Sequence, residues 1–506
     1  MTRVRSLAMP LTIAAVIAVS PARADTLREA LARAYQDNPT ITGSRARQRA
    51  IDETVPIARA AGRPTLGSNA GVTENYLRSG NSFTTPEKVA QAQLALNVPF
   101  YSGGAVRNSV RAAETRVEAG QLGLRGTEAG LFTEVVGAYN DVLRDEAIVG
   151  LNAQNVRVLE TNLQASRDRF QVGDLTRTDV AQSEARLSLA RAQLDRVRAN
   201  LIASRENYVR LVGGAPGALE PPPPLPNLPS NADAAVDVAL RDNPTLLSAL
   251  KERDATAFDV RVARASRLPT LGIGATGNYV NYLGSLGSGT GLGVGQSGTS
   301  AGIGLNVSLP FFQGGRPAAL VRQAQAQRSQ AIENATAAER QVIASTRSAY
   351  AVWQSSLQVI ASSEQAVAAN QLSLEGVRAE NSVGTRTILD ILNAEQELLN
   401  SQVTLVTARR DAYVAGFALL AAMGQAEAQD LGLEAGPLYN SADNYRSVRG
   451  RFSDFSDGPA PQAIAPSTST VPPQNATVTR PLDPALDSSK VDRSPALTTG
   501  ENAPNR

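Results

Sequence analysis

A short turn motif occurs twice in this chain of 506 residues. The first copy is Val172-Gly173-Asp174-Leu175-Thr176-Arg177-Thr178-Asp179-Val180, and the second is Val383-Gly384-Thr385-Arg386-Thr387-Ile388-Leu389-Asp390-Ile391-Leu392. In each copy glycine suits a tight reversal at the end of a helix, and an aspartate falls in the first turn of the next helix, where the dipole favours a carboxylate. The motif therefore predicts two hairpins of long helices, each reversing at a glycine.

The turns belong to a larger duplication. Asp37-Asn38-Pro39-Thr40 recurs as Asp242-Asn243-Pro244-Thr245 at an offset of 205 residues, and Val172-Gly173 recurs as Val383-Gly384 at an offset of 211. An ordered series of such matches indicates one structural unit written twice. We expect two equivalent repeats, residues 25–215 and 233–424. Each opens with a helix of about 30 residues and continues with two strands, a very long helix and a returning helix.

The segments outside the repeats are assigned from composition. An N-terminal apolar run after Arg3 and Arg5, followed by Ala22-Arg23-Ala24, is typical of a cleaved signal peptide, with a short membrane anchor as the alternative. Proline-rich stretches are stiff, and segments poor in apolar residues are disordered. The predicted segments are a signal peptide (1–24), a Pro-rich linker (216–232), an equatorial segment (425–451) and a disordered C-terminal tail (452–506).

The helical part of each repeat is unusually long. Residues 101–215 and 318–436 contain no proline, as an uninterrupted helix requires. A helix over residues 105–170 would be roughly 100 Å long and would need other long helices to pack against. Leu187, Leu194 and Leu201 lie on a seam with heptad spacing. A solitary soluble coiled coil is the alternative on periodicity alone.

The strands have the pattern of membrane strands. Apolar and polar residues alternate in 90–98, 271–279 and 300–309, and more weakly in 65–77. Segments of about ten residues with aromatic ends suit a tilted outer-membrane strand, although a soluble sheet packed on helices would alternate too. Four strands cannot close a barrel, and an open edge cannot sit in lipid. If the strands are in a membrane, several chains must share one barrel, with Gly/Ser/Thr loops outside the cell.

Composition argues against catalysis. The chain has 49 Lys+Arg and 47 Asp+Glu, and it has neither His nor Cys. These counts exclude imidazole and thiolate chemistry and the usual metal ligands, so we expect no enzyme activity, no metal and no cofactor. No basic cluster supports a nucleic-acid partner. An exported enzyme is therefore disfavoured.

Together these features resemble the TolC family of outer-membrane efflux and type I secretion channels, over about residues 26–425. The carriers are the Asn-Pro pairs, the strand exits 96–104 and 309–315, and the two turns. The resemblance implies an α+β membrane fold: a homotrimer with four strands per chain, twelve in the barrel, continued by a long periplasmic α-helical coiled-coil barrel. It implies as partners a periplasmic adaptor, an inner-membrane ABC exporter or drug pump, and outer-membrane lipid.

The resemblance also implies roles for the turn residues. The position of Asp390 lines a constriction, and that of Arg386 holds the entrance closed by bonds toward Thr178 and Asp179. This chain departs from the family pattern at two positions: Asn393 replaces a second aspartate of the constriction, and Asn381 replaces a tyrosine of the latch. The resemblance therefore implies a weaker ring of charge and a looser gate. The residues expected to dock the adaptor are Gly173, Leu175, Thr176, Gly384, Thr385 and Arg386.

The favoured function is a gated exit duct in the outer membrane with a helical tunnel in the periplasm. The alternative is a periplasmic coiled-coil scaffold or adaptor, but one hairpin would serve an adaptor and the duplicated amphipathic strands would have no purpose. Protein secretion and small-molecule efflux both use the architecture. The lack of a lipid-attachment cysteine favours secretion.

Overall fold

A computed structural model describes residues 25–77, 86–286, 295–433, 438–478, 480–483 and 486. The predicted signal peptide lies outside these residues, as do most of the two loops expected outside the cell. No helix among the described residues is long and apolar enough to cross a membrane. The helices are α1 (Leu27–Asp37), α2 (Pro39–Asp52), α3 (Thr54–Ala60), α4 (Ala105–Gln171), α5 (Arg177–Val212), α6 (Ala232–Asp242), α7 (Pro244–Ala265), α8 (Arg316–Ser382), α9 (Ile388–Met423) and α10 (Ser441–Val448).

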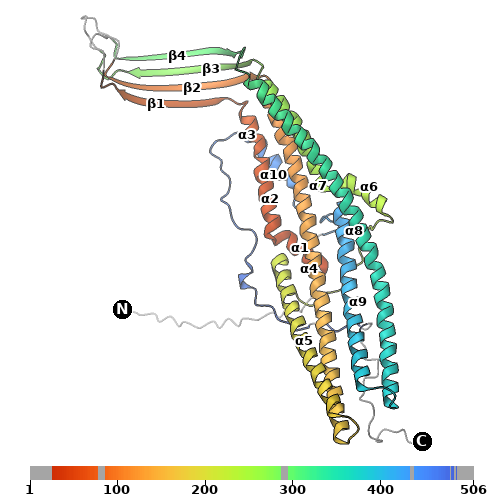
Figure 1. Ribbon diagram of the computed structural model, residues 1–506. Helices are drawn as coiled ribbons and strands as arrows, with labels where there is room; N and C mark the ends of the chain where they lie inside the picture. Colours follow the sequence, from red (N-terminus) through yellow and green to blue (C-terminus); the bar gives the residue numbers. More distant parts are fainter. Residues whose placement is uncertain are drawn as a thin grey trace, which may run out of the picture.

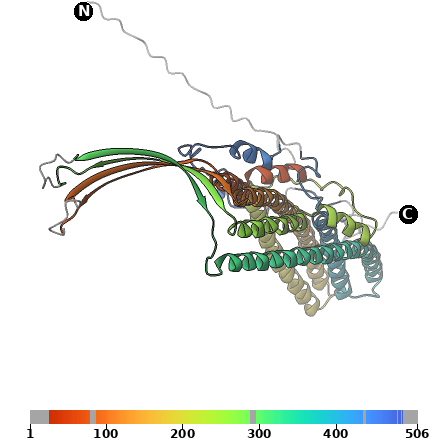
Figure 2. The same ribbon diagram turned by 90° about the horizontal axis from the view of Figure 1, so that it is seen from above.

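Two strands from each repeat form one antiparallel sheet in the order β1-β2-β3-β4. The weakly alternating segment 65–77 does contain a strand, because β1 pairs with β2 from Thr65↔Asn97 to Glu74↔Lys88. The sheet is a curved layer at one end of the molecule, joined to the helices at its base (Figures 1 and 2). The strands are β1 (Thr65–Glu74), β2 (Lys88–Ser102), β3 (Thr270–Asn281) and β4 (Ser297–Ser308).

The two predicted hairpins are present. Helices α4 and α8 each span 67 residues, and α5 and α9 each span 36. Each long helix begins just after its repeat's last strand and runs away from the sheet, so that both hairpin turns lie at the far end of the molecule (Figure 1). The predicted length of roughly 100 Å follows from 1.5 Å of rise per residue.

The Asn-Pro motifs break the opening helix of each repeat into pieces, contrary to the single helix that the sequence predicts. Proline has no N–H to continue the hydrogen-bond ladder, and the preceding asparagine caps the new helix. The Asn38 side chain accepts from the Thr40 N–H (2.8 Å) and donates to the Leu211 carbonyl (2.8 Å). Asn243 repeats both roles, with its amide 2.9 Å from the Ala422 carbonyl. The motif therefore also fastens each opening segment to the end of the returning helix.

The predicted disorder of residues 452–506 is wrong for part of the tail that the structure describes. Residues 474–478 and 480–483, here named the C-terminal strap, run along the helices at mid-height. Arg205 of α5 donates to the carbonyls of Asn475 (2.7 Å) and Thr477 (2.8 Å) and forms a buried ion pair with Glu146 of α4. Backbone carbonyls, which composition does not report, thus hold the strap in place.

The strap also reaches the second repeat. Leu482 lies so close to Gly150 of α4 that a Cβ there would approach its side chain to 3.0 Å. Asp483 forms an ion pair with Arg409 of α9 (2.9 Å). The strap therefore touches α5, α4 and α9, and it links the two hairpins above their turns.

Candidate gate at the hairpin turns

The first turn joins α4 to α5 as the sequence predicts. Gly173 has φ +81°, a left-handed conformation that side chains disfavour, and it lets the chain reverse. Thr176 and Asp179 form a capping box: the Thr176 N–H and hydroxyl donate to one Asp179 oxygen at 3.0 and 2.7 Å. Arg169 and Asp174 form an ion pair across the turn (2.8 Å). The Asp179 carboxylate is thus engaged in its own helix start, and Thr178 beside it is exposed.

The second turn is built in the same way. Gly384 has φ +84°, and Thr387 and Asp390 form the capping box of α9 with hydrogen bonds of 2.9 and 2.8 Å to one Asp390 oxygen. These two bonds from Thr387, with a further contribution from the Arg386 charge, lower the pKa of Asp390 below its ordinary value. Asp390 is therefore a firmly ionised, half-buried carboxylate at the turn.

Arg386 does not reach Thr178 or Asp179 within one chain. Its guanidinium pairs with Glu380 of its own hairpin at 2.7 Å, and both side chains are about half exposed (50% and 51%). That pairing raises the pKa of Arg386. The sequence analysis did not single out Glu380, although it is the carboxylate that most closely precedes Arg386 in the chain.

Asn381 is buried and folds into the turn rather than across to the other hairpin. Its amide donates to the Arg386 carbonyl at 2.7 Å. The Thr385 hydroxyl donates to the Glu380 carbonyl at 2.9 Å. These short-range bonds fix the conformation of the turn that displays the exposed Arg386 side chain.

Asn393 makes the contact between the hairpins. Its side-chain oxygen accepts from the Arg186 guanidinium at 2.8 Å, across 207 residues of sequence. Among the described residues this is the one side-chain hydrogen bond between α5 and α9. The bond is exposed to solvent, so water competes with it. The sequence analysis missed Arg186, because only the packing of two helices far apart in the chain brings it to Asn393.

Ion pairs above the turns differ between the hairpins. Arg378 and Glu395 are 2.5 Å apart with side chains 11% and 3% exposed. Their counterparts in the first hairpin, Arg167 and Glu184, are 2.6 Å apart but 50% and 48% exposed. Each pair spans 17 residues of sequence, and this shared spacing within the repeat was the signal that could have revealed them.

The residues predicted to dock an adaptor lie around two exposed valines. Val172 is 75% and Val383 74% exposed, at the C-caps of α4 and α8. Gly173, Thr176, Gly384 and Thr385 are exposed beside them, and Leu175 is half-buried. Each turn therefore presents a highly exposed valine among exposed glycine and polar residues, with a second, less exposed apolar side chain nearby, Phe170 or Leu389.

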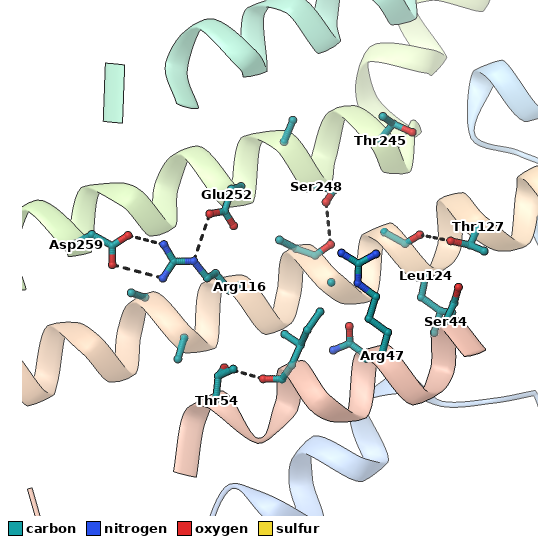
Figure 3. Close-up of a pocket in the computed structure, with 18 of the residues that line it drawn as sticks. Ser44, Arg47, Thr54, Arg116, Leu124, Thr127, Thr245, Ser248, Glu252 and Asp259 are labelled. Atoms are coloured by element: carbon teal, nitrogen blue, oxygen red, sulfur yellow. Dashed lines mark hydrogen bonds and ion pairs between the residues drawn. The ribbon is translucent and has the colours of Figure 1, made fainter. Parts of the chain in front are cut away.

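A cavity of about 840 Å³ lies away from the turns, between α2, α4 and α7 (Figure 3). Arg116 lies between Glu252 and Asp259, and the Ser248 hydroxyl donates to the Ala119 carbonyl. Within the cavity, the charge of Arg116 is thus neutralised by two carboxylates. No group of His, Cys, Asp and Glu able to hold a metal occurs in the described part of the chain.

Known proteins share this architecture. The family described as outer membrane efflux protein matches residues 30–214 and 235–425, once per repeat. The outer membrane efflux protein BepC of Brucella suis is 33% identical over 86% of this chain and 93% of its own length. The alkaline protease secretion protein AprF of Pseudomonas aeruginosa is 29% identical over 68% of this chain and 71% of its own.

Solved structures agree on the fold. The Campylobacter jejuni CmeC outer membrane channel has a TM-score of 0.70 at 15% identity over 84% of this chain and 89% of its own. VceC of Vibrio cholerae has a TM-score of 0.66 at 23% identity over 79% and 96%. The predicted fold class, outer-membrane location and exit-channel function are confirmed. With both repeats matched, this chain belongs to the outer membrane efflux protein family, whose members are exit channels for efflux and type I secretion.

Proposed function

We propose that three copies of this chain form a gated exit duct, each contributing two equivalent units, residues 25–215 and 233–424. The sheet supports the number of copies. Four strands leave the outer edges of β1 and β4 unpaired, and unpaired edges are excluded from lipid. Three copies give a barrel of twelve strands, and each copy contributes four long helices to the wall of the tunnel.

The gate lies at the hairpin turns. The observation that carries this proposal is a contrast in contacts: an exposed Arg186–Asn393 bond joins the hairpins near the turns, whereas the strap above them binds to the buried Arg205–Glu146 pair. Exposed polar contacts contribute about 0.2–1 kcal/mol each, so a docked partner can break them. The hairpins therefore separate at the turns while they stay tied at mid-height.

Asp390 and Arg386 act in the assembled ring. Threefold symmetry turns Asp390 into three ionised carboxylates, which attract cations at a constriction. Arg386 holds the entrance closed by exchanging Glu380 for Thr178 or Asp179 of an adjacent hairpin. Asn393 adds no charge to this ring, and the Arg386 charge acts on Asp390.

Partners dock on the same turns. A periplasmic adaptor covers Val172 and Val383, and an inner-membrane ABC exporter or drug pump delivers the cargo. The names of the relatives cover both efflux and protease secretion, so we assign the choice of cargo to the pump.

The gate is tested by single-channel conductance of the purified channel in planar bilayers. Arg186→Ala and Arg386→Ala each raise the mean conductance, because each removes a contact that keeps the hairpins together. Arg191→Ala is the control, since Arg191 is an exposed arginine that pairs with Glu160 inside one hairpin (2.7 Å). Conductance that rises no more in Arg186→Ala and Arg386→Ala than in the control contradicts the gate.

Docking is tested by site-specific crosslinking, which is clean because the chain has no cysteine. Cysteines placed at Thr176 and Thr385 capture the adaptor, and a cysteine at the exposed Thr161, higher on α4, captures it less. Equal capture at all three positions removes the assignment of the docking surface.

A further inference from the structure

The segment that follows α10 carries two solvent-exposed phenylalanines. Phe452 is 68% exposed and Phe455 is 97% exposed, in a chain with only 10 phenylalanines. Every residue from 449 to 464 is exposed. Large apolar side chains on an exposed loop have an energetic cost that a binding surface would relieve.

Residues 449–457, here named the foot, are held in place by two arginines of the first repeat. The Arg59 guanidinium donates to the Arg449 carbonyl at 2.8 Å. The Arg63 guanidinium donates to the Arg451 carbonyl at 2.5 Å and lies 5.1 Å from the centre of the Phe452 ring. The foot is therefore a positioned surface, in which two anchors fix the backbone and leave the aromatic rings outward.

The anchors place the foot at the base of the sheet. Arg63 stands two residues before Thr65, the first residue of β1. The trace after α10 passes the end of α3 from which β1 departs (Figure 1). The strand exits at the same end of the sheet also expose aromatics: Phe100 is 79%, Phe311 91% and Phe312 89% exposed. The foot thus continues the aromatic boundary where an outer-membrane sheet leaves lipid on the periplasmic side.

Charge completes the surface. Arg449 and Arg451 are exposed and form no ion pair within the described residues, and Asp454 and Asp457 are the acidic groups of the same segment. Arginine beside aromatic rings is the composition of segments that lie in a lipid headgroup layer, with rings at the acyl boundary and guanidinium groups on phosphates.

We propose that the foot binds the inner leaflet of the outer membrane. Phe452 and Phe455 enter the headgroup region, and Arg449 and Arg451 bind phospholipid phosphates. The foot adds a lipid contact beside the membrane strands and secures the upper end of the C-terminal tail. This inference rests on the outer-membrane location and is independent of the gate and of the docking partners.

Tryptophan fluorescence tests the foot, because the chain has a single Trp. In a Trp353→Phe background, Phe455→Trp supplies the only indole of the full-length channel in proteoliposomes. Entry into the headgroup region should shift its emission to the blue. Phospholipids brominated near the headgroup should then reduce the emission about twofold. Ile464→Trp in the same background is the control, because Ile464 is 62% exposed on the same tail but lies beyond the foot. Its emission should be insensitive to the brominated lipid.

The contribution of the arginine charges is measured by quenching in vesicles of phosphatidylcholine with and without phosphatidylglycerol. The anionic lipid should strengthen quenching of Phe455→Trp, and Arg449→Glu with Arg451→Glu should abolish that gain. An indole that aqueous iodide quenches as fully as the control overturns the proposal. An indole shielded from both iodide and lipid also overturns it, because protein then covers the foot. Heat-dependent gel migration of the assembled channel confirms that each variant is folded.

Discussion

Helices α4 and α8 are copies of one another that live in different surroundings. Both span 67 residues and occupy matching places in their repeats. Tyr139 of α4 is fully buried, and its hydroxyl donates to the carbonyls of Asp25 (2.9 Å) and Glu220 (2.7 Å). Its counterpart Tyr350 in α8 is partly exposed, and its hydroxyl donates to the Ser230 carbonyl at 3.1 Å. Other segments of the same chain cover α4, whereas most of the α8 surface is exposed.

Helix α8 exposes six large apolar side chains, and at five of the matching positions α4 carries a polar residue; the sixth, Val359, matches Ile148. Leu372 is 71% exposed, and the residue 211 positions earlier is Thr161. The matched pairs are Leu320 and Ser109, Ile332 and Gln121, Val352 and Asp141, Leu357 and Glu146, and Leu372 and Thr161. In the proposed trimer, the exposed apolar side chains of α8 would face a neighbouring copy, whereas α4 is covered by its own chain.

The strap gives the largest test of this asymmetry. A chain ended after residue 473 lacks the carbonyls that accept from Arg205 and leaves the Arg205–Glu146 pair without them. We expect a loss of about 3–5 kcal/mol in the free energy of unfolding, because two hydrogen bonds to a charged group are lost and each contributes about 1.5–3 kcal/mol. Denaturant unfolding measures it. A chain ended after residue 486 keeps the strap and is the control; equal stability of the two shortened chains contradicts the role of the strap.

The ion pairs above the turns test the asymmetry in the opposite direction, because here the second repeat is the buried one. Glu395→Ala leaves Arg378 buried without this carboxylate and should cost about 3 kcal/mol. Glu184→Ala breaks the exposed equivalent and should cost at most about 1 kcal/mol. Thermal unfolding of the two variants gives the ratio. Similar costs would mean that the two pairs have equivalent surroundings in the assembled channel.

A matched pair of glutamates tests the asymmetry by pH. Burial raises the pKa of Glu128 in α4 to about 7, whereas Glu339, its counterpart in α8, is exposed. A raised carboxyl pKa means that the folded state binds more protons, so this contribution is present below about pH 4.5 and is lost as the pH rises through 7. Relative to Glu128→Gln, the natural chain should lose about 2 kcal/mol between pH 5 and 8. Glu339→Gln should follow the natural chain across that range.

Exchange of one matched pair of side chains gives the smallest effect. Leu372→Thr makes α8 resemble α4 and removes apolar area from the proposed contact between copies, at about 1 kcal/mol per chain. The trimer fraction in detergent, followed by light scattering, should fall. Thr161→Leu is the reciprocal control and should leave the trimer unchanged. A trimer unaffected by either substitution would assign Leu372 to another surface.

The sequence predicted the features whose signals are local. These are the turn glycines, the capping threonines and the alternation in β2 and β4, each of which depends on neighbouring residues in the chain. Because the chain is duplicated, each signal occurs twice. Contacts such as Arg186 with Asn393 depend on how two hairpins pack, which residue spacing does not encode. The strap escaped for another reason. Composition counts residue types, and it does not show which backbone carbonyls accept from Arg205 or that Leu482 and Asp483 have partners on the helices.

The strap also sets an order of events in the making of the protein. Arg205 and Glu146 are synthesised and exported long before residues 475 and 477, the last groups needed to complete their surroundings. The middle of the tunnel therefore stays unfinished until nearly the whole chain has crossed the inner membrane. A truncated or clipped chain displays a hydrated arginine and glutamate where an intact one displays a closed belt. The contacts of Arg205 with residues 475 and 477 are therefore among the last to form, after both hairpins have been made.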